Sequence, residues 1–165
     1  FERDGAAFVD PSHYPAKAAA CVSTHDLPTV AGWWTGADVD EKQALGLLTA
    51  EAADAERSER LASKEALAAA LERADVTEGA HIDGAAPHDV AITAAIHRYV
   101  GASPSGLVMI QADDLAGETM AVNLPGTDRS RPNWRRKLSV DVDALWQTDA
   151  GAQAIADFTP ARTGR

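Results

Sequence analysis

The stretch AAACVSTHDLPT, from Ala18 to Thr29, decides how the fold of this chain is interpreted. Its first half is a short run of small and β-branched residues bounded by turn formers, which is typical of a buried strand. Its second half places His25 and Asp26 directly after that strand and before Pro28. Because proline disfavours helix at the residue before it, we expect the pair on a rigid turn at the end of the strand.

A second apolar run, GLVMIQ from Gly106 to Gln111, also leads into acids, Asp113 and Asp114. Strands that are apolar along their length and separated by helices are typical of parallel sheets covered on both faces. In such folds the functional groups sit at the carboxyl ends of the strands. The sequence therefore predicts an α/β, helix-rich fold with polar clusters at the carboxyl ends of its strands.

Helices are predicted between and after these strands. Ala, Leu, Glu and Lys dominate residues 41–73, and Asp38 with Glu41 resembles a helix start. A later helix is expected to open at Pro87 and to bury one face, which is formed by Ile92, Ile96 and Val100. A short helix is expected over residues 142–158, whereas VNLPGT and RPNWRRKLSV are expected to be loops.

Composition favours a globular protein that acts on neutral or cationic partners. A length of 165 residues suits a single unit, residues 1–165. Twenty-five acids against 15 Lys and Arg give a net charge of -10, which repels nucleic acid over most of the surface. No apolar run approaches the roughly 18 residues of a membrane span, so no membrane partner is expected. The single Cys21 and the opening FERDG, which has no leader pattern, predict a cytoplasmic protein without a secretory signal.

Each candidate site residue also has a simpler explanation. Asp26 at a strand-to-helix turn could act only as a helix cap. Trp33 and Trp34 could be core residues or a flat platform for sugar rings or bases, and at least one is expected in the core. Asn123 and Trp134 offer an amide and an indole donor, groups that bind hydroxyl-rich ligands, but turn formation explains Asn123 equally well.

The remaining histidines and acids match no metal-ligand spacing, so no metal site is predicted. They are His13, His81, Asp83, His88 and Asp89. The basic segment RSRPNWRRK, residues 129–137, is interpreted as a local anion site or as ordinary ion pairs rather than a nucleic-acid surface.

Four segments form a distinctive series along the chain: ERD with Tyr14-Pro15, STHDLPTVAGWWTG, DDLAGETMAVNLPGT and PNWRRKLSV. In this order they resemble the C-terminal part of bacterial 4-alpha-glucanotransferases, the amylomaltases of glycoside hydrolase family 77. The region from about Glu41 to Asp89 resembles the family by position only. The family fold is a (β/α)8 TIM barrel with inserted helical subdomains. The resemblance therefore implies that this chain forms the last strands and helices of an incomplete barrel.

The resemblance also implies a chemistry: retaining transfer of an alpha-1,4-glucan segment to the 4-hydroxyl of glucose or another glucan. It makes Asp26 the third, transition-state stabilising carboxylate beside a nucleophile and an acid/base. His25 is then a substrate-binding residue that donates to a hydroxyl of the same ring, and Asn123 is a glucan-binding residue near the acceptor channel. The implied partners are maltooligosaccharides and other alpha-1,4-glucans of starch, glycogen or maltose metabolism, with no cofactor.

In the family, the nucleophile and the acid/base belong to earlier barrel strands, and no residue of this chain can be assigned either role. The chain alone is therefore expected to be inactive. It is also expected to self-associate, because a few strands of a barrel leave apolar faces and backbone edges uncovered.

Two other protein classes match parts of the pattern. The pairs His25-Asp26 and His88-Asp89 suggest an HD-type metal-dependent phosphohydrolase, which a stoichiometric divalent metal would favour. Trp33, Trp34 and Trp134 suggest a noncatalytic carbohydrate-binding module that uses them as stacking surfaces.

Overall fold

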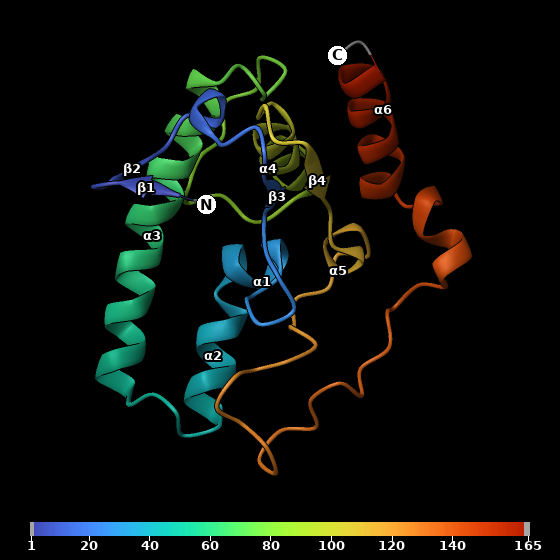
Figure 1. Cartoon of the computed structure of the whole chain (residues 1–165). Coiled ribbons are helices and arrows are strands. Elements are labelled where there is room, and N and C mark those ends of the chain that lie inside the picture. Colours follow the sequence, from blue (N-terminus) through green and yellow to red (C-terminus); the bar gives the residue numbers. More distant parts are fainter. Residues whose placement is uncertain (1, 164–165) are drawn as a thin grey trace.

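The structure is a computed structural model that describes residues 2–163, with side chains described up to Phe158. In the described residues its two sheets each have two strands, and helices form most of the regular secondary structure (Figure 1). An antiparallel hairpin near the N-terminus pairs β1 (Arg3–Asp4) with β2 (Ala7–Phe8), and Gly5 takes a positive φ of 61° in its turn. The sequence patterns did not indicate this hairpin.

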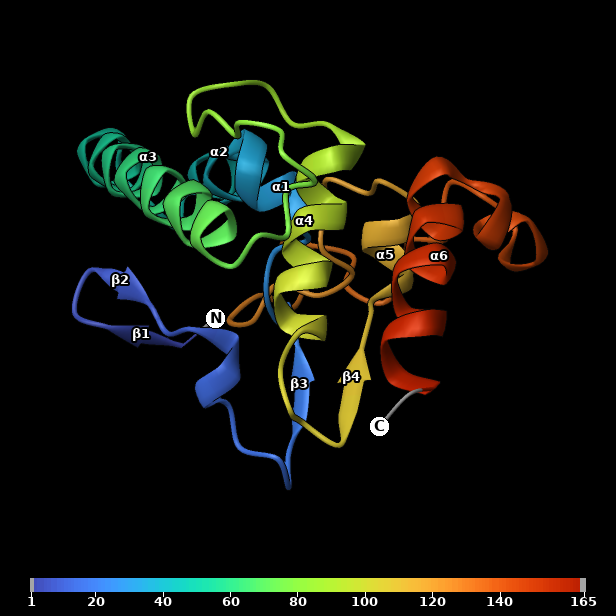
Figure 2. The ribbon, with the colours of Figure 1, turned by 90° about the horizontal axis from the view of Figure 1, so that it is seen from above.

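The two predicted strands form a parallel pair, as expected. In the register of β3 (Ala19–Cys21) and β4 (Leu107–Met109), Ala20 lies opposite Val108. Each strand has three residues, so both are shorter than the apolar runs that predicted them. Figure 2 shows the two strands side by side. The segment of chain that connects them contains every long helix except the C-terminal one.

Each segment predicted to be helical contains at least one helix, although the boundaries differ. The region after the His25-Asp26 turn contains α1 (Val30–Thr35), α2 (Ala37–Ala44) and α3 (Ala50–Arg73). Next come α4 (Val90–Gly101) and the four-residue α5 (Ala112–Leu115), which follows β4. The chain ends with the 3-10 helix η2 (Val142–Gln147) and α6 (Asp149–Thr163), and another 3-10 turn, η1 (Pro11–His13), precedes β3.

The core is organised around α4, which lies between α3 and α6 in both views (Figures 1 and 2). Its predicted buried face is confirmed: Ile92, Ile96 and Val100 are all at most 4% exposed. Ile92 and Ile96 meet the α3 residues Leu67 and Leu71 and the indole of Trp34 in one hydrophobic cluster. A smaller cluster of Leu115, Leu145 and Ala154 joins α5 to the last two helices.

Three predicted helix boundaries were wrong. The helix expected to open at Pro87 begins at Val90, because Asp89 caps it by accepting from the Ile92 N–H at 2.9 Å. The cap of α2 is Gly36 rather than Asp38, whose carboxylate is bonded to Arg60 instead. The helix expected over 142–158 is divided at Thr148, whose hydroxyl accepts from the Gly151 N–H and so starts α6 afresh.

The parallel pair is covered on one face only, as expected for a few strands of an incomplete barrel. One face carries buried Ala20, but the other leaves Leu107 65% and Met109 53% exposed. The described part of the chain contains no closed barrel, so no other strands cover that face. Among the described helices, none has both the length and the apolar character needed to cross a membrane.

Candidate functional site

A tight turn after β3 presents His25 and Asp26. The Leu27 N–H donates to the Thr24 carbonyl at 3.0 Å, and the Ser23 hydroxyl donates to the Pro28 carbonyl at 2.7 Å, which closes the turn. The helix cap is Thr29, whose Oγ1 accepts from the Gly32 N–H at 3.0 Å. Asp26 is therefore not the cap of α1, and its carboxylate is available for another role.

The structure brings the three predicted site residues together. Asn123 Nδ2 donates to Asp26 Oδ1 at 2.6 Å, although 97 positions separate the two residues. His25 Nε2 lies 3.5 Å from the other carboxylate oxygen, Asp26 Oδ2. The side chains of His25 and Asp26 are 58% and 51% exposed, so a ligand can reach both. An ionised carboxylate only accepts hydrogen bonds, which assigns the Asn123 amide nitrogen as the donor.

Trp134 completes this group. Its indole lies against the His25 ring, with ring centroids 5.1 Å apart and planes inclined at 53°. The indole is 60% exposed, and the backbone adopts a φ of +62°, a left-handed conformation that is rare for a bulky residue. Because this conformation is costly and the exposed ring gains little from burial, the arrangement favours a functional role for Trp134.

Asn123 and Trp134 belong to one loop that is closed at its base. The Trp134 N–H donates to the Val122 carbonyl at 3.0 Å. Because Val122 precedes Asn123, this bond holds together the two residues that contact Asp26 and His25. Asn133 braces the loop by accepting from the Leu124 N–H at 3.1 Å. Arg131, only 8% exposed, pairs with Glu41 at 2.7 Å. The sequence singled out Asn123 and Trp134, but it offered no signal for the bracing by Arg131 and Asn133.

A groove of about 570 Å³ extends from this loop. Asn123 and Trp134 both line it, and the same two residues contact Asp26 and His25. The other lining residues are mostly polar: Thr127, Asp128, Arg129, Arg131, Pro132, Asn133 and Arg135. Such a surface suits a hydroxyl-rich ligand better than an apolar one.

The basic segment that forms part of this groove behaves largely as predicted. Arg131 pairs with Glu41, and Arg136 pairs with Asp113 and Glu118. These are ordinary ion pairs within the chain, and they hold the loop to α2 and to the region around α5.

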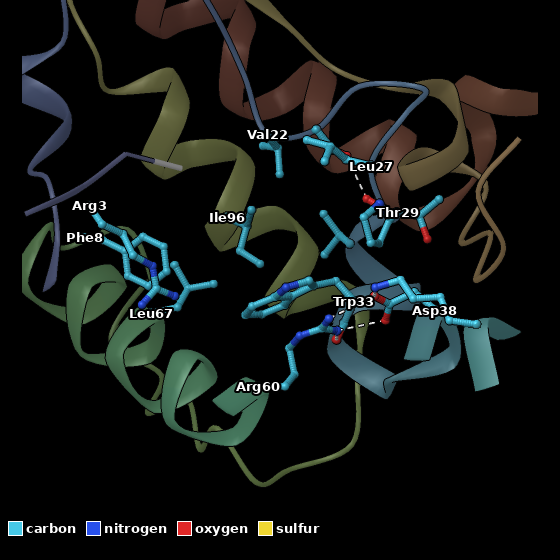
Figure 3. Close-up of a pocket in the computed structure, with 14 residues that line it drawn as sticks. Arg3, Phe8, Val22, Leu27, Thr29, Trp33, Asp38, Arg60, Leu67 and Ile96 are labelled. Carbon is cyan, nitrogen blue, oxygen red and sulfur yellow. Dashed lines mark hydrogen bonds and ion pairs between the residues drawn. The ribbon is translucent and has the colours of Figure 1, made fainter. Parts of the chain in front are cut away.

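A second cavity, of about 350 Å³, lies beside the end of the turn at Leu27 (Figure 3). Leu27 and Pro28 form one wall, and Phe8, Leu67 and Ile96 contribute apolar surface from the hairpin, α3 and α4. Figure 3 shows Trp33 beside the ion pair of Arg60 and Asp38, whose shortest distance is 2.9 Å.

The tryptophans do not share one surface. Trp33 lines the second cavity, whereas Trp34 is 2% exposed and donates through its indole N–H to the Ala86 carbonyl at 2.9 Å. The prediction that at least one of the pair is a core residue is therefore confirmed for Trp34. Only Trp134 lies at the His25-Asp26 turn.

The other histidines and acids serve local structure. Asp89 caps α4, and His88 Nε2 lies 2.8 Å from the Thr93 hydroxyl. His81 Nδ1 lies 2.6 Å from Glu72 on the exposed surface. Within residues 2–158, no group of three or more His, Cys, Asp or Glu side chains is arranged to hold a metal ion.

The two acids after β4 have different roles. Asp113 pairs with Arg136, while the Asp114 side chain is fully buried and accepts from the Val30 N–H at 2.7 Å. The sequence marked both acids as lying at a strand end, but it did not indicate that Asp114 would face the start of α1.

Comparison with known proteins gives a consistent result. The family model described as 4-alpha-glucanotransferase, glycoside hydrolase family 77, matches residues 1–142. A 4-alpha-glucanotransferase of Haemophilus influenzae is 32% identical over 143 residues, which cover 84% of this chain and 20% of that protein. One from Mycobacterium bovis is 38% identical over 118 residues, covering 72% of this chain and 16% of that protein.

A solved structure agrees with these relatives. The crystal structure of amylomaltase from Corynebacterium glutamicum superposes with a TM-score of 0.79 at 25% identity, covering 90% of this chain and 22% of that one. The chain thus spans about a fifth of the length of the proteins it matches.

Proposed function

Because this chain belongs to the 4-alpha-glucanotransferase family, glycoside hydrolase family 77, we propose that it carries the third catalytic carboxylate of a retaining glucan transfer. In that reaction a glucosyl chain is cleaved from an alpha-1,4-glucan and passed to the 4-hydroxyl of glucose or another glucan. The observation that carries the proposal is the 2.6 Å bond from Asn123 to Asp26, which joins two distant motifs at one exposed carboxylate.

Asp26 has the properties that this role requires. Its carboxylate is half-exposed, and one of its oxygens is oriented by Asn123. Negative charge at this point would stabilise an oxocarbenium-like transition state, and its remaining lone pairs would accept hydrogen bonds from sugar hydroxyls. His25, whose ring packs against Trp134, would donate to a neighbouring hydroxyl.

Asn123 takes a more specific role in this proposal than the resemblance implied. Its amide nitrogen is used by Asp26, so its first task is to orient that carboxylate. Its amide oxygen remains an acceptor, and Asn123 lines the polar groove, which we propose as the path of the bound glucan. The substrates are accordingly maltooligosaccharides and other alpha-1,4-glucans, in a cytoplasmic enzyme of starch, glycogen or maltose metabolism.

The test is Asp26→Asn in the full-length protein that contains this sequence. The amide oxygen of the variant still accepts from Asn123, so the turn should be retained while the charge is lost. We expect disproportionation of maltotriose to fall by about a hundredfold or more, the size of effect seen when a transition-state stabilising group is removed. Glucose release is the measurement, and an unchanged melting temperature shows that the fold is intact.

Asp143→Asn serves as the matched control, because Asp143 is exposed on η2 and far along the chain from the turn. It should keep full activity. Near-normal transfer by folded Asp26→Asn protein would end the assignment. The 165-residue chain alone should release no glucose, because a nucleophile and a proton donor are also required.

The two alternative classes receive less support. The metal-dependent phosphohydrolase would need the His25-Asp26 and His88-Asp89 pairs to act as ligands, but Asp89 caps α4. The binding module would need three exposed tryptophans, but Trp34 is buried.

A further inference from the structure

Asp114 is a buried acid whose role is not explained by the core around it. Its side chain is 0% exposed, and it lies on α5, directly after β4. Its Oδ1 accepts from the Val30 N–H at 2.7 Å, across 84 positions of sequence. Val30 is the first residue of α1, so this N–H is one of the donors that a helix leaves without an internal partner.

The rest of the carboxylate is poorly satisfied. Its Oδ2 lies 3.6 Å from Nε2 of His97, a side chain that is 3% exposed on α4. In the described part of the chain, neither of these two atoms has a hydrogen-bond partner. Burial of a carboxylate with so few bonds is unfavourable, so stability alone does not account for an acid at this position.

The position of the bond suggests what the acid does. Val30 follows Thr29, whose hydroxyl donates to the Glu118 carbonyl at 2.5 Å. Pro28, one residue earlier, accepts from Ser23 and closes the turn that carries His25 and Asp26. Asp114 and Glu118 therefore hold the downstream end of that turn to the segment that follows β4.

We propose that Asp114 is a positioning residue: it fixes the start of α1 and thereby places the Asp26 carboxylate against Asn123. This inference rests on the proposed glucan transfer. Asp114 does not touch the substrate, and it acts only through the Val30 N–H. Loss of the bond should let the turn shift, and a small misplacement of a catalytic group is costly to the chemical step.

The experiment uses the full-length protein and breaks the bond from both sides. Asp114→Val removes the acceptor, and Val30→Pro removes the donor while leaving the acid in place. Proline is tolerated at the first position of a helix, and Thr29 already has the extended backbone that must precede it, with φ -64° and ψ 161°. Asp114→Asn is the conservative variant, since its amide oxygen can still accept from Val30.

We expect Asp114→Val and Val30→Pro each to lower kcat about tenfold or more with KM within about twofold, because the lost interaction matters in the transition state. Asp114→Asn should stay within about threefold of the unsubstituted protein. In both damaging variants, amide hydrogen exchange should accelerate in residues 23–36. Ala53→Gly, a buried α3 change outside the hydrophobic cluster of Val30 and Trp34, should lower the melting temperature but alter neither kcat nor that exchange.

Equal kcat in Asp114→Val, Val30→Pro and Ala53→Gly, measured below their melting temperatures, would overturn the proposal. An equal loss in Asp114→Asn would also overturn it, because the charge rather than the bond would then matter. If Asp114→Val does not fold, the kcat and the hydrogen exchange of Val30→Pro test the proposal instead. If the unsubstituted protein transfers no glucan, the proposed function fails, while the exchange of residues 23–36 still shows whether Asp114 holds the turn.

Discussion

At the scale of single residues, Trp134 is where backbone preference and site geometry oppose each other. A φ of +62° is unfavourable for an aromatic residue, by roughly 1–2 kcal/mol, and favourable for glycine. The indole nevertheless stays 60% exposed against the His25 ring. Stability would be served by glycine at this position, so we attribute the tryptophan to its contact with His25 and the groove.

This conflict predicts that substitutions at position 134 will affect the free energy of unfolding and the transfer activity differently. Trp134→Gly and Trp134→Ala both remove the indole, but only glycine relieves the backbone. We expect Trp134→Gly to be more stable than Trp134→Ala by ~1 kcal/mol in the free energy of unfolding, and therefore to melt at a higher temperature. Both should lose maltotriose disproportionation to the same extent in the full-length protein.

Thermal unfolding and glucose release measure the two effects. Trp146→Ala, an exposed tryptophan on η2 with 51% of its surface accessible, provides the control and should keep full activity. Retained activity in either Trp134 variant would remove Trp134 from the site.

At the scale of elements, the short helix α1 is held in place by close backbone contact. A Cβ on Gly32 would overlap the Thr119 carbonyl oxygen and lie 2.9 Å from Thr29 Oγ1. The absence of a side chain therefore lets α1 approach the segment after α5. This approach brings the Thr29 hydroxyl within 2.5 Å of the Glu118 carbonyl.

Gly32→Ala is accordingly predicted to be harmful although alanine is a better helix former than glycine. The added methyl group should push α1 from Glu118 and Thr119, at a cost of about 1–3 kcal/mol, as for other overpacked sites. It should also lower activity by displacing the turn. Chemical denaturation and the transfer assay measure these effects.

Gly106→Ala is the control for Gly32→Ala. Its added Cβ would lie 3.4 Å from the Ala16 carbonyl oxygen, which is an ordinary van der Waals contact. We expect little effect from that change. A Gly32→Ala protein as stable as the unsubstituted one would show that α1 has room to move.

At the scale of the whole molecule, the parallel pair β3–β4 is covered on one face only. Ala20 is buried, while Leu107 and Met109 are 65% and 53% exposed on the other face. In the described residues each of these strands also has one unpaired edge. Exposed apolar surface next to free backbone donors and acceptors favours association.

We therefore predict that the 165-residue chain self-associates at micromolar concentration, most simply as a two-fold dimer. Sedimentation velocity measures the association. Replacing Leu107 and Met109 together by serine should weaken it, because apolar burial contributes roughly 25 cal/mol per Å².

Leu61→Ser should leave the association unchanged, since Leu61 is a single exposed leucine on α3. A chain that stays monomeric would refute the prediction and would mean that the helices shield the sheet in solution.

Much of the architecture follows from sequence patterns that act over short range. Helical periodicity places Ile92, Ile96 and Val100 on one side of α4, and that side is buried. Tertiary packing also buries the remaining sides of this helix, including Thr93 and His97. The apolar runs around Ala20 and Val108 indicated two strands, and the proline after His25-Asp26 indicated a turn between β3 and α1. Local backbone preferences are sufficient for these features.

Tertiary structure alone decided which partner each polar group found. Asp26 and Asp114 were both acids near a strand end, and either could have capped α1. The docking of α5 directed Asp114 to Val30, and Thr29 served as the cap, so Asp26 was left to meet Asn123. Such choices depend on the position of segments more than 80 residues apart, as the separations of 84 and 97 positions show, and no local pattern encodes that position.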